Sequence, residues 1–144
     1  MTTVHLKPHK EDSLLRFHPW VFSGAIRSIE LDADYPHAQP QEGEIVKVVD
    51  CKGKTLGVGH YQIGSIAVRI LEFGVGELPK DFWKTRIAAA YGVRKSLGLV
   101  TEENNTYRLI HGGGDFLPGL IVYVYADTAV IQAHSVGMHY HREE

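Results

Sequence analysis

The sequence predicts a mostly β protein with some α, in which a small β-barrel is followed by a helix packed on an antiparallel sheet. Three observations support this fold class. Up to about residue 73, short runs of apolar residues are separated by glycine-containing turns. Residues 79–97 then carry apolar side chains at helical spacing. Three strand-like segments follow, at 107–111, 120–125 and 128–133.

The first zone, residues 1–73, is predicted to form the barrel. "EIVKVVD" alternates two faces, "CKGK" is typical of a turn, and "TLGVGHY" fits the returning strand. "IAVRILEF" predicts a further strand, and the glycines at 53, 57, 59 and 64 suit a strongly bent sheet. Residues 31–43 contain two prolines and a glycine, and this composition predicts a long surface loop.

The second zone, residues 74–144, is predicted to be a small α/β domain. Pro79 suits the first position of a helix, and Gly98 suits its end. We expect the apolar stripe of this helix to pack across the three strands. The stripe residues Trp83, Ile87 and Tyr91 would bury against Leu109, Ile121 and Val130. On this prediction, Ile87→Asp would unfold the second zone.

Four glycines in "LIHGGGDFLPGLIVYVY" (109–125) raise the question of a ligand-binding loop. A dinucleotide loop opens a helix, but strand sequence follows here and the third glycine of G-x-G-x-x-G is replaced by Leu117. "HGGG" resembles an oxyanion-hole motif, and "AHSVG" around Ser135 resembles a nucleophile elbow. Too few residues follow Ser135 to supply the partners of a triad. We therefore expect a sharp connection between strands.

Composition restricts the remaining function classes. The net charge is −2, and the lone Cys51 cannot form an internal disulfide, which favours a reducing, cytoplasmic setting. No apolar run reaches the length of a membrane span, so we expect no membrane partner. The histidines at 134, 139 and 141 match no usual zinc spacing, so no metal site is predicted.

Four segments together carry a resemblance to a known family. They are "FHPWVFSGAI" (17–26), "EGEIVKVVDCKGKTLGVGHY" (42–61), "IAVRIL" (66–71) and "YRLIHGGGDFLPGLIVYVYADTAVIQAHSVGM" (107–138). They resemble the N-terminal part of the S-adenosylmethionine (SAM)-dependent methyltransferases that modify cytosine C5 in large-subunit ribosomal RNA. The resemblance implies an RNA-binding PUA-like barrel at 1–73 and the start of a middle α/β domain at 74–144.

The resemblance also implies a methyltransferase domain beyond the middle domain, and SAM as the cofactor of the full-length parent. This chain has no SAM loop and no Asp-Pro-Pro motif, so we expect it to contain no catalytic, cofactor or metal residue. It departs from the family pattern at Gly113, Phe116 and Tyr123. We expect the tail from His134 to be mobile, or to pair with a neighbouring molecule as in a homodimer. A free-standing PUA-type RNA-binding adaptor is the alternative function.

The expected partner is RNA, in particular ribosomal RNA. Basic side chains on segments that a barrel could bring to one face would contact phosphates. The candidate RNA-binding residues are Arg16, His18, Lys47, Lys52, Lys54 and Arg69. Trp20 is expected to be a core anchor rather than a platform on which a base stacks.

Overall fold

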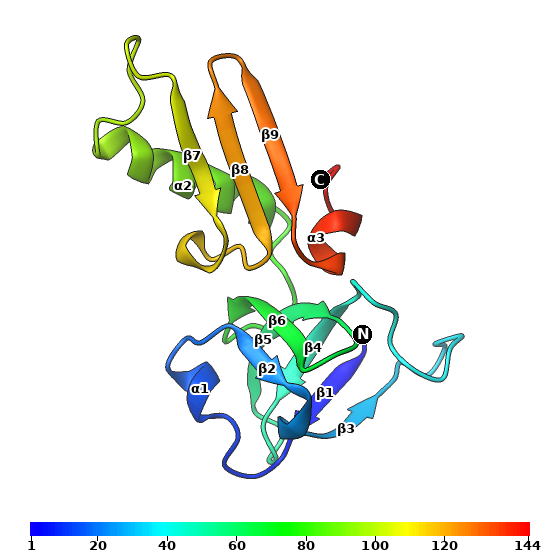
Figure 1. Cartoon of the computed structure of the whole chain (residues 1–144). Helices are drawn as coiled ribbons and strands as arrows, with labels where there is room; N and C mark the ends of the chain where they lie inside the picture. Colours follow the sequence, from blue (N-terminus) through cyan, green and yellow to red (C-terminus); the bar gives the residue numbers. More distant parts are fainter. The chain divides into compact units, whose positions relative to one another are not determined.

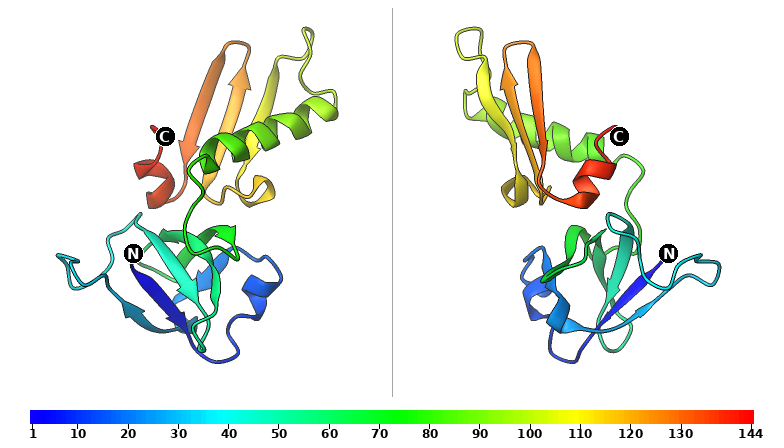
Figure 2. Two further views of the ribbon diagram at one scale, coloured as in Figure 1. Left: turned by 180° about the vertical axis from the view of Figure 1, so that it is seen from behind. Right: turned by 45° about the vertical axis from the view of Figure 1, so that its right-hand side comes forward.

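The computed structural model describes residues 1–144, which divide into two compact units, Met1–Leu78 and Pro79–Glu144. The fold is mostly β with three α-helices, as the sequence predicts (Figures 1 and 2). Each unit has a sheet of its own, six-stranded in the first and three-stranded in the second. No helix has the length and apolar character that crossing a membrane requires.

The first unit is a curled six-stranded sheet in the order β2-β6-β5-β4-β1-β3. Its strands are β1 (Thr3–Leu6), β2 (Trp20–Phe22), β3 (Ile26–Glu30), β4 (Ile45–Val49), β5 (Thr55–Tyr61) and β6 (Ile66–Phe73). A short helix, α1 (Asp12–Leu15), and a 3-10 turn at Ser23–Ala25 flank β2. Only β1 and β4 pair in parallel; the other neighbours are antiparallel. β2 and β3 are the two edges, so the predicted barrel is open between them.

Side chains that alternate along these strands fill the inside of the curl. The buried cluster consists of Val4, Leu6, Leu14, Val21, Val46, Val48, Leu56, Val68 and Ile70. Gly57 and Gly59 lie where β5 approaches β6 most closely, since a Cβ at either position would overlap the β6 backbone. This close approach explains why glycines mark the bent strand. Residues 31–43 form a loop without strand or helix, as predicted.

The second unit is an antiparallel sheet in the order β7-β8-β9. Its elements are α2 (Phe82–Ser96), β7 (Thr106–His111), β8 (Leu120–Tyr125), β9 (Thr128–Ala133) and α3 (Val136–Tyr140). The predicted strands and their hairpin are confirmed. α2 crosses one face of the sheet, and α3 lies beside the end of β9 (Figure 2). Gly98, with φ of 71°, ends the helical segment as predicted.

The packing of α2 differs from the prediction in its start and in its partners. The helix begins at Phe82 rather than Pro79, and Phe82 and Ala90 are its buried residues. Ile87 is 39% exposed, and Tyr91 and Leu97 are exposed as well. The cost of Ile87→Asp is therefore expected to be smaller than a fully buried site would give.

Of the three sheet residues predicted to lie under α2, Leu109 does and the other two do not. Ile87 lines an apolar pocket with Ile110, Leu120, Val122 and Ile131, so these residues face the helix. Ile121 and Val130 alternate with them and therefore lie on the opposite face. A register shift between Arg108 and Ile110 brings Leu109 to the pocket as well. Such a shift is not visible in the apolar pattern, and moving by one residue exchanges the two faces.

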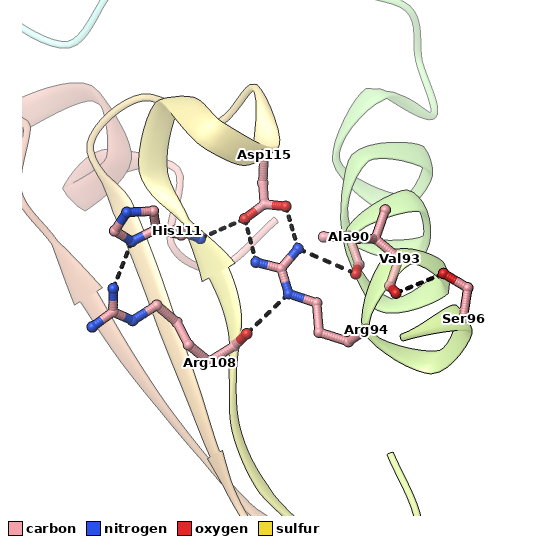
Figure 3. A network of polar contacts seen from close by, with 7 residues as sticks. All are labelled: Ala90, Val93, Arg94, Ser96, Arg108, His111 and Asp115. Atoms are coloured by element: carbon pink, nitrogen blue, oxygen red, sulfur yellow. Dashed lines mark hydrogen bonds and ion pairs between the residues drawn. The ribbon is translucent and has the colours of Figure 1, made fainter. Parts of the chain in front are cut away.

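The glycine-rich segment is a tight connection between β7 and β8, as predicted. Gly112–Asp115 forms a 3-10 turn, and Phe116 (φ 57°) and Gly119 (φ 94°) take left-handed conformations. Figure 3 shows what holds this turn. Asp115 accepts two hydrogen bonds from the Arg94 guanidinium on α2, one of them 2.7 Å long, and one of 2.6 Å from the backbone N–H of His111. Arg94 Nε also donates to the carbonyl of Arg108 at 3.0 Å.

The C-terminal tail packs against the second unit, and whether it is mobile in solution stays a prediction. Met138 is only 2% exposed, and it lines the apolar pocket under α2. The His141 ring stacks on Trp83 with centroids 5.7 Å apart, and Trp83 Nε1 donates to Glu144 at 2.7 Å. Ser135, considered above as a nucleophile, is the N-cap of α3: its Oγ accepts from the backbone N–H of Met138.

Candidate nucleic-acid interface

The edge strand β2 presents aromatic side chains to solvent. Val21 points into the buried cluster, so Trp20 and Phe22 on either side of it point outward. Trp20 is 40% exposed, and its ring contacts that of Phe22 edge to face at 6.4 Å. β2 pairs only with β6, where Trp20 lies opposite Arg69.

The loop before β2 extends this aromatic row. Phe17 has a left-handed backbone (φ 60°) and is 67% exposed. A non-glycine residue in this conformation costs roughly 1–2 kcal/mol, and such strain is concentrated at functional sites. The Phe17 ring contacts Phe73 edge to face at 5.4 Å, and His18 contacts Trp20 at the same distance. We call Phe17, His18, Trp20 and Phe22 the aromatic row.

A groove of about 340 Å³ lies beside the aromatic row, between α1 and β2. It is lined by Lys10, Ser13, Leu14, Trp20, Val21, Phe22, Gly24 and Ala25. Lys7 Nζ donates to the carbonyl of Gly24 at 2.8 Å, so a second lysine holds the groove wall. Aromatic walls together with the Lys10 side chain suit a base and its phosphate.

Two of the predicted RNA-binding residues lie beside Trp20, and a third lies on the loop that precedes it. His18 contacts its ring, Arg69 is its partner across β2 and β6, and Arg16 lies on the same exposed loop. The Arg69 guanidinium donates to Gln62 at 3.1 Å and to the carbonyl of Ile66 at 3.3 Å. Partial burial lowers the pKa of Arg69, but an arginine stays charged at neutral pH.

Lys52 and Lys54 lie in the turn between β4 and β5. Both backbone N–H groups donate to Asp50 Oδ1, at 2.8 and 2.9 Å, and these bonds hold the pKa of Asp50 below its ordinary value. Both lysine side chains are exposed. This turn and the Phe17 loop share one end of the sheet, because Phe17 packs on Phe73, which pairs with Gly57 just beyond the turn.

Lys47 is the one predicted residue apart from both groups. It lies in the middle of β4, on the outer side, and its side chain runs past Gly76. Five of the six residues thus form two groups: Arg16, His18 and Arg69 on the loop before β2 and across from Trp20, and Lys52 and Lys54 in the turn between β4 and β5. No group of three His, Cys, Asp or Glu side chains in the structure could hold a metal ion.

The fold of this unit matches a known domain family. Residues 4–73 match the PUA-like domain. The PUA-like unit therefore contains the groove, the aromatic row and all six predicted residues.

The whole chain is similar to longer proteins. It is 37% identical over 145 residues to "Ribosomal RNA large subunit methyltransferase I" of Tolumonas auensis. The matched region includes 99% of this chain and 34% of the relative. The protein of the same name from Shewanella amazonensis is 39% identical over 143 residues, which are 97% of this chain and 34% of that relative. The chain thus spans about a third of the length of the curated relatives it matches.

Solved structures share the fold of the chain. A candidate SAM-dependent methyltransferase from Streptococcus mutans superposes with a TM-score of 0.76 at 16% identity, over 99% of this chain and 35% of that protein. A structure described as a complex of a methyltransferase with SAH gives the same values. At this identity the likeness concerns the fold alone.

Sequence reasoning missed the aromatic half of the site in the PUA-like unit. Trp20 was expected in the core, but β2 is only three residues long and its buried position belongs to Val21. The "WVF" alternation contains this signal, since two large rings flank a smaller β-branched residue that fits the inside of a curled sheet. Lys10, Phe17 and Phe22 carried no comparable signal, because their role depends on how α1 and its loop fold beside β2.

Proposed function

We propose that this chain is the RNA-binding N-terminal region of a ribosomal RNA methyltransferase and positions RNA for a catalytic domain elsewhere in the parent protein. One observation carries the proposal. The PUA-like unit exposes a row of aromatic rings next to a groove that Lys10 lines. Rings supply stacking and cations supply phosphate contacts, which are the two components of single-strand recognition.

For the parent protein we propose SAM-dependent methylation of large-subunit ribosomal RNA at cytosine C5, in the cytoplasm. The names of the relatives support the ribosomal RNA substrate, and the family resemblance supports SAM and the C5 position. In this assignment the chain presented here supplies affinity and orientation, and its residues take no part in the methyl transfer.

Trp20 provides the sharpest test of the proposal. A base stacked on Trp20 contributes about 1–3 kcal/mol, so Trp20→Leu should weaken binding of a labelled large-subunit ribosomal RNA fragment roughly tenfold. Trp20→Phe keeps an aromatic face and should restore most of the affinity. Fluorescence anisotropy measures both. Equal affinities of the Leu and Phe variants would contradict the stacking role.

A second pair of variants tests the charged group. Lys52→Glu with Lys54→Glu should weaken RNA binding and flatten its dependence on salt, because phosphate contacts release counterions. Lys84→Glu with Lys95→Glu, on exposed positions of α2, changes the net charge equally and is the matched control. If both pairs reduce affinity alike, the effect is one of net charge and the assigned surface is wrong.

A further inference from the structure

The three-stranded sheet of the second unit has one uncovered face. α2 and the pocket residues Val122 and Ile131 occupy the other face (Figure 2). The strand register aligns the uncovered side chains in three rows across the sheet. The rows are Thr106–Tyr125–Thr128, Arg108–Tyr123–Val130 and His111–Ile121–Gln132. We call these residues the open face.

Two tyrosines and an arginine form an ordered stack at the centre of the open face. The rings of Tyr123 and Tyr125 are stacked, with centroids 6.2 Å apart and planes 26° from parallel. The Arg108 guanidinium lies over the Tyr123 ring, 4.8 Å from its centroid. Tyr125 is 48% exposed, so the stack ends in a ring that a further planar group can reach.

Hydrogen bonds fix Arg108 in this position before any ligand arrives. Its guanidinium donates to the hydroxyl of Tyr123 and contacts His111 Nδ1 at 2.7 Å (Figure 3 shows the contact with His111). A guanidinium has five N–H donors, and these two contacts leave others directed to solvent. Because the side chain is already ordered, less conformational entropy is lost when it binds an anion.

The charge of the sheet favours an anionic partner. None of the residues of β7, β8 and β9 is Asp or Glu, while Arg108 and His111 lie on the open face. Of the carboxylates on the two connections between these strands, Asp115 is paired with Arg94, and Asp127 in the turn after β8 accepts a hydrogen bond from Thr128. An exposed cation beside stacked aromatic rings, without a competing carboxylate on the strands, complements a strand of bases and phosphates.

We infer that the open face binds single-stranded RNA, with one base stacked on Tyr125 and a phosphate held by Arg108. This surface is separate from the groove and aromatic row of the PUA-like unit, and nothing in its argument depends on them. An A-form duplex hides the faces of its bases, so a site built on exposed rings selects unpaired nucleotides.

The test uses the full 144-residue chain and a fluorescein-labelled ten-nucleotide oligouridylate. Tyr125→Leu keeps an apolar strand residue but removes the π face, and should weaken binding roughly tenfold. Tyr125→Phe should bind like the unaltered chain, since only the hydroxyl is lost. Arg108→Gln should lower the slope of log affinity against log salt by about one. With 4-thiouridine in the probe, photo-crosslinks should map to residues 120–125.

The outcomes separate this inference from the proposed function. If Trp20→Leu weakens binding but Tyr125→Leu does not, the PUA-like unit binds RNA and the open face does not. If the Tyr125→Leu and Tyr125→Phe variants bind the RNA equally weakly, a base does not stack on the ring of Tyr125. If Tyr125→Leu changes only sedimentation of the protein without RNA, the open face is a contact between copies. Each of these results overturns the inference, whereas a loss confined to the Leu variant supports it.

Discussion

The two units of this chain bury their side chains in different ways. The curled sheet of the PUA-like unit encloses a cluster of nine buried apolar residues that come from five strands and α1. The sheet of the second unit is covered on one face only, and every residue of β9 is exposed. Its buried apolar side chains are few, and they include Ile110, Leu117 and Met138.

This difference determines what holds each unit together. A buried apolar cluster stabilises the PUA-like unit, and its polar link between strand side chains, His5 with Glu30, lies on the surface. The second unit depends in addition on two polar links, Arg94 with Asp115 and Trp83 with Glu144, which connect α2 to the glycine-rich turn and to the tail. We therefore expect apolar truncation to affect the first unit most, and loss of charge or of a cap to affect the second.

The largest expected effect is that of Leu6→Ala in the PUA-like unit. Leu6 is fully buried in the cluster, and shortening such a residue costs about 2–5 kcal/mol because of the lost burial and the cavity. Residue-resolved hydrogen exchange should show lower protection in β1, β4 and β5, with the strands of the second unit unchanged. An equal loss of protection in both units would show that the two units unfold together, which would contradict the view that each is stabilised by its own contacts.

The next effect in size is that of Asp115→Asn in the second unit. The substitution leaves the Arg94 guanidinium without its carboxylate, and hydrogen bonds to charged groups contribute about 1.5–3 kcal/mol. Urea unfolding monitored at Trp83, in a Trp20→Phe background, reports on this unit. Asp127→Asn, on the exposed hairpin turn, is the control and should change little. Equal midpoints for the two variants would mean that the polar link does not stabilise the unit.

The sequence predicts most of the fold because its apolar periods and turn residues are local signals. These signals predict the main helix, the strands at 45–49, 55–61 and 66–73, and the three strands between residues 106 and 133. The face of the second sheet that α2 covers does not follow, because β8 carries apolar or aromatic side chains on both faces and its alternation does not say which face is buried. The packing of the tail does not follow from local signals either, since Met138 is buried by a pocket that α2 and the sheet form.

The sequence predicts part of the charge of the candidate site, but neither Lys10 in the groove nor the exposed rings. Lysines in a glycine turn are exposed wherever the turn lies, so Lys52 and Lys54 could be named from the sequence. Trp20 is different, because a tryptophan suits a core and an RNA surface equally well. Only the pairing of β2 as an edge strand, with Val21 inward, decides between them. Whether the six predicted residues bind RNA stays a prediction.

Acid should weaken the second unit through Asp115. Burial alone would raise the pKa of this carboxyl, but hydrogen bonds from Arg94 and from the His111 backbone N–H outweigh burial and hold it below the ordinary 3.8. A lowered folded-state pKa contributes stability that is complete above the unfolded value and is lost as the pH falls through the folded value. Stability should therefore decline from about pH 4 downward.

The pH effect should not exceed that of Asp115→Asn, since protonation and the substitution both remove the negative charge and both leave an oxygen that accepts hydrogen bonds. Urea midpoints of the second unit between pH 2 and 6 measure it. In the Asp115→Asn variant the same profile should be flatter. If the Asp115→Asn variant has the same dependence of the urea midpoint on pH as the unaltered chain, the acid sensitivity comes from other carboxyls. One of them is Asp50 of the PUA-like unit, whose pKa is also lowered.

The smallest effect should be that of Ser135→Ala, which removes the N-cap of α3. Side-chain caps contribute about 0.5–2 kcal/mol, and a bond as long as 3.4 Å places this one at the low end. The substitution should raise hydrogen exchange at residues 136–140 and leave β7 and β8 protected, because the cap holds the tail but not the sheet.

Gly119→Ala should act in the same direction and more strongly, since its Cβ would overlap the Ser135 hydroxyl and its backbone is left-handed. If the tail already exchanges fast in the unaltered chain, neither change will be visible there, and the packing of Met138 under α2 is not maintained in solution. A visible change in both variants would instead show that one hydroxyl and one glycine, neighbours only in the folded chain, hold the tail against the second unit.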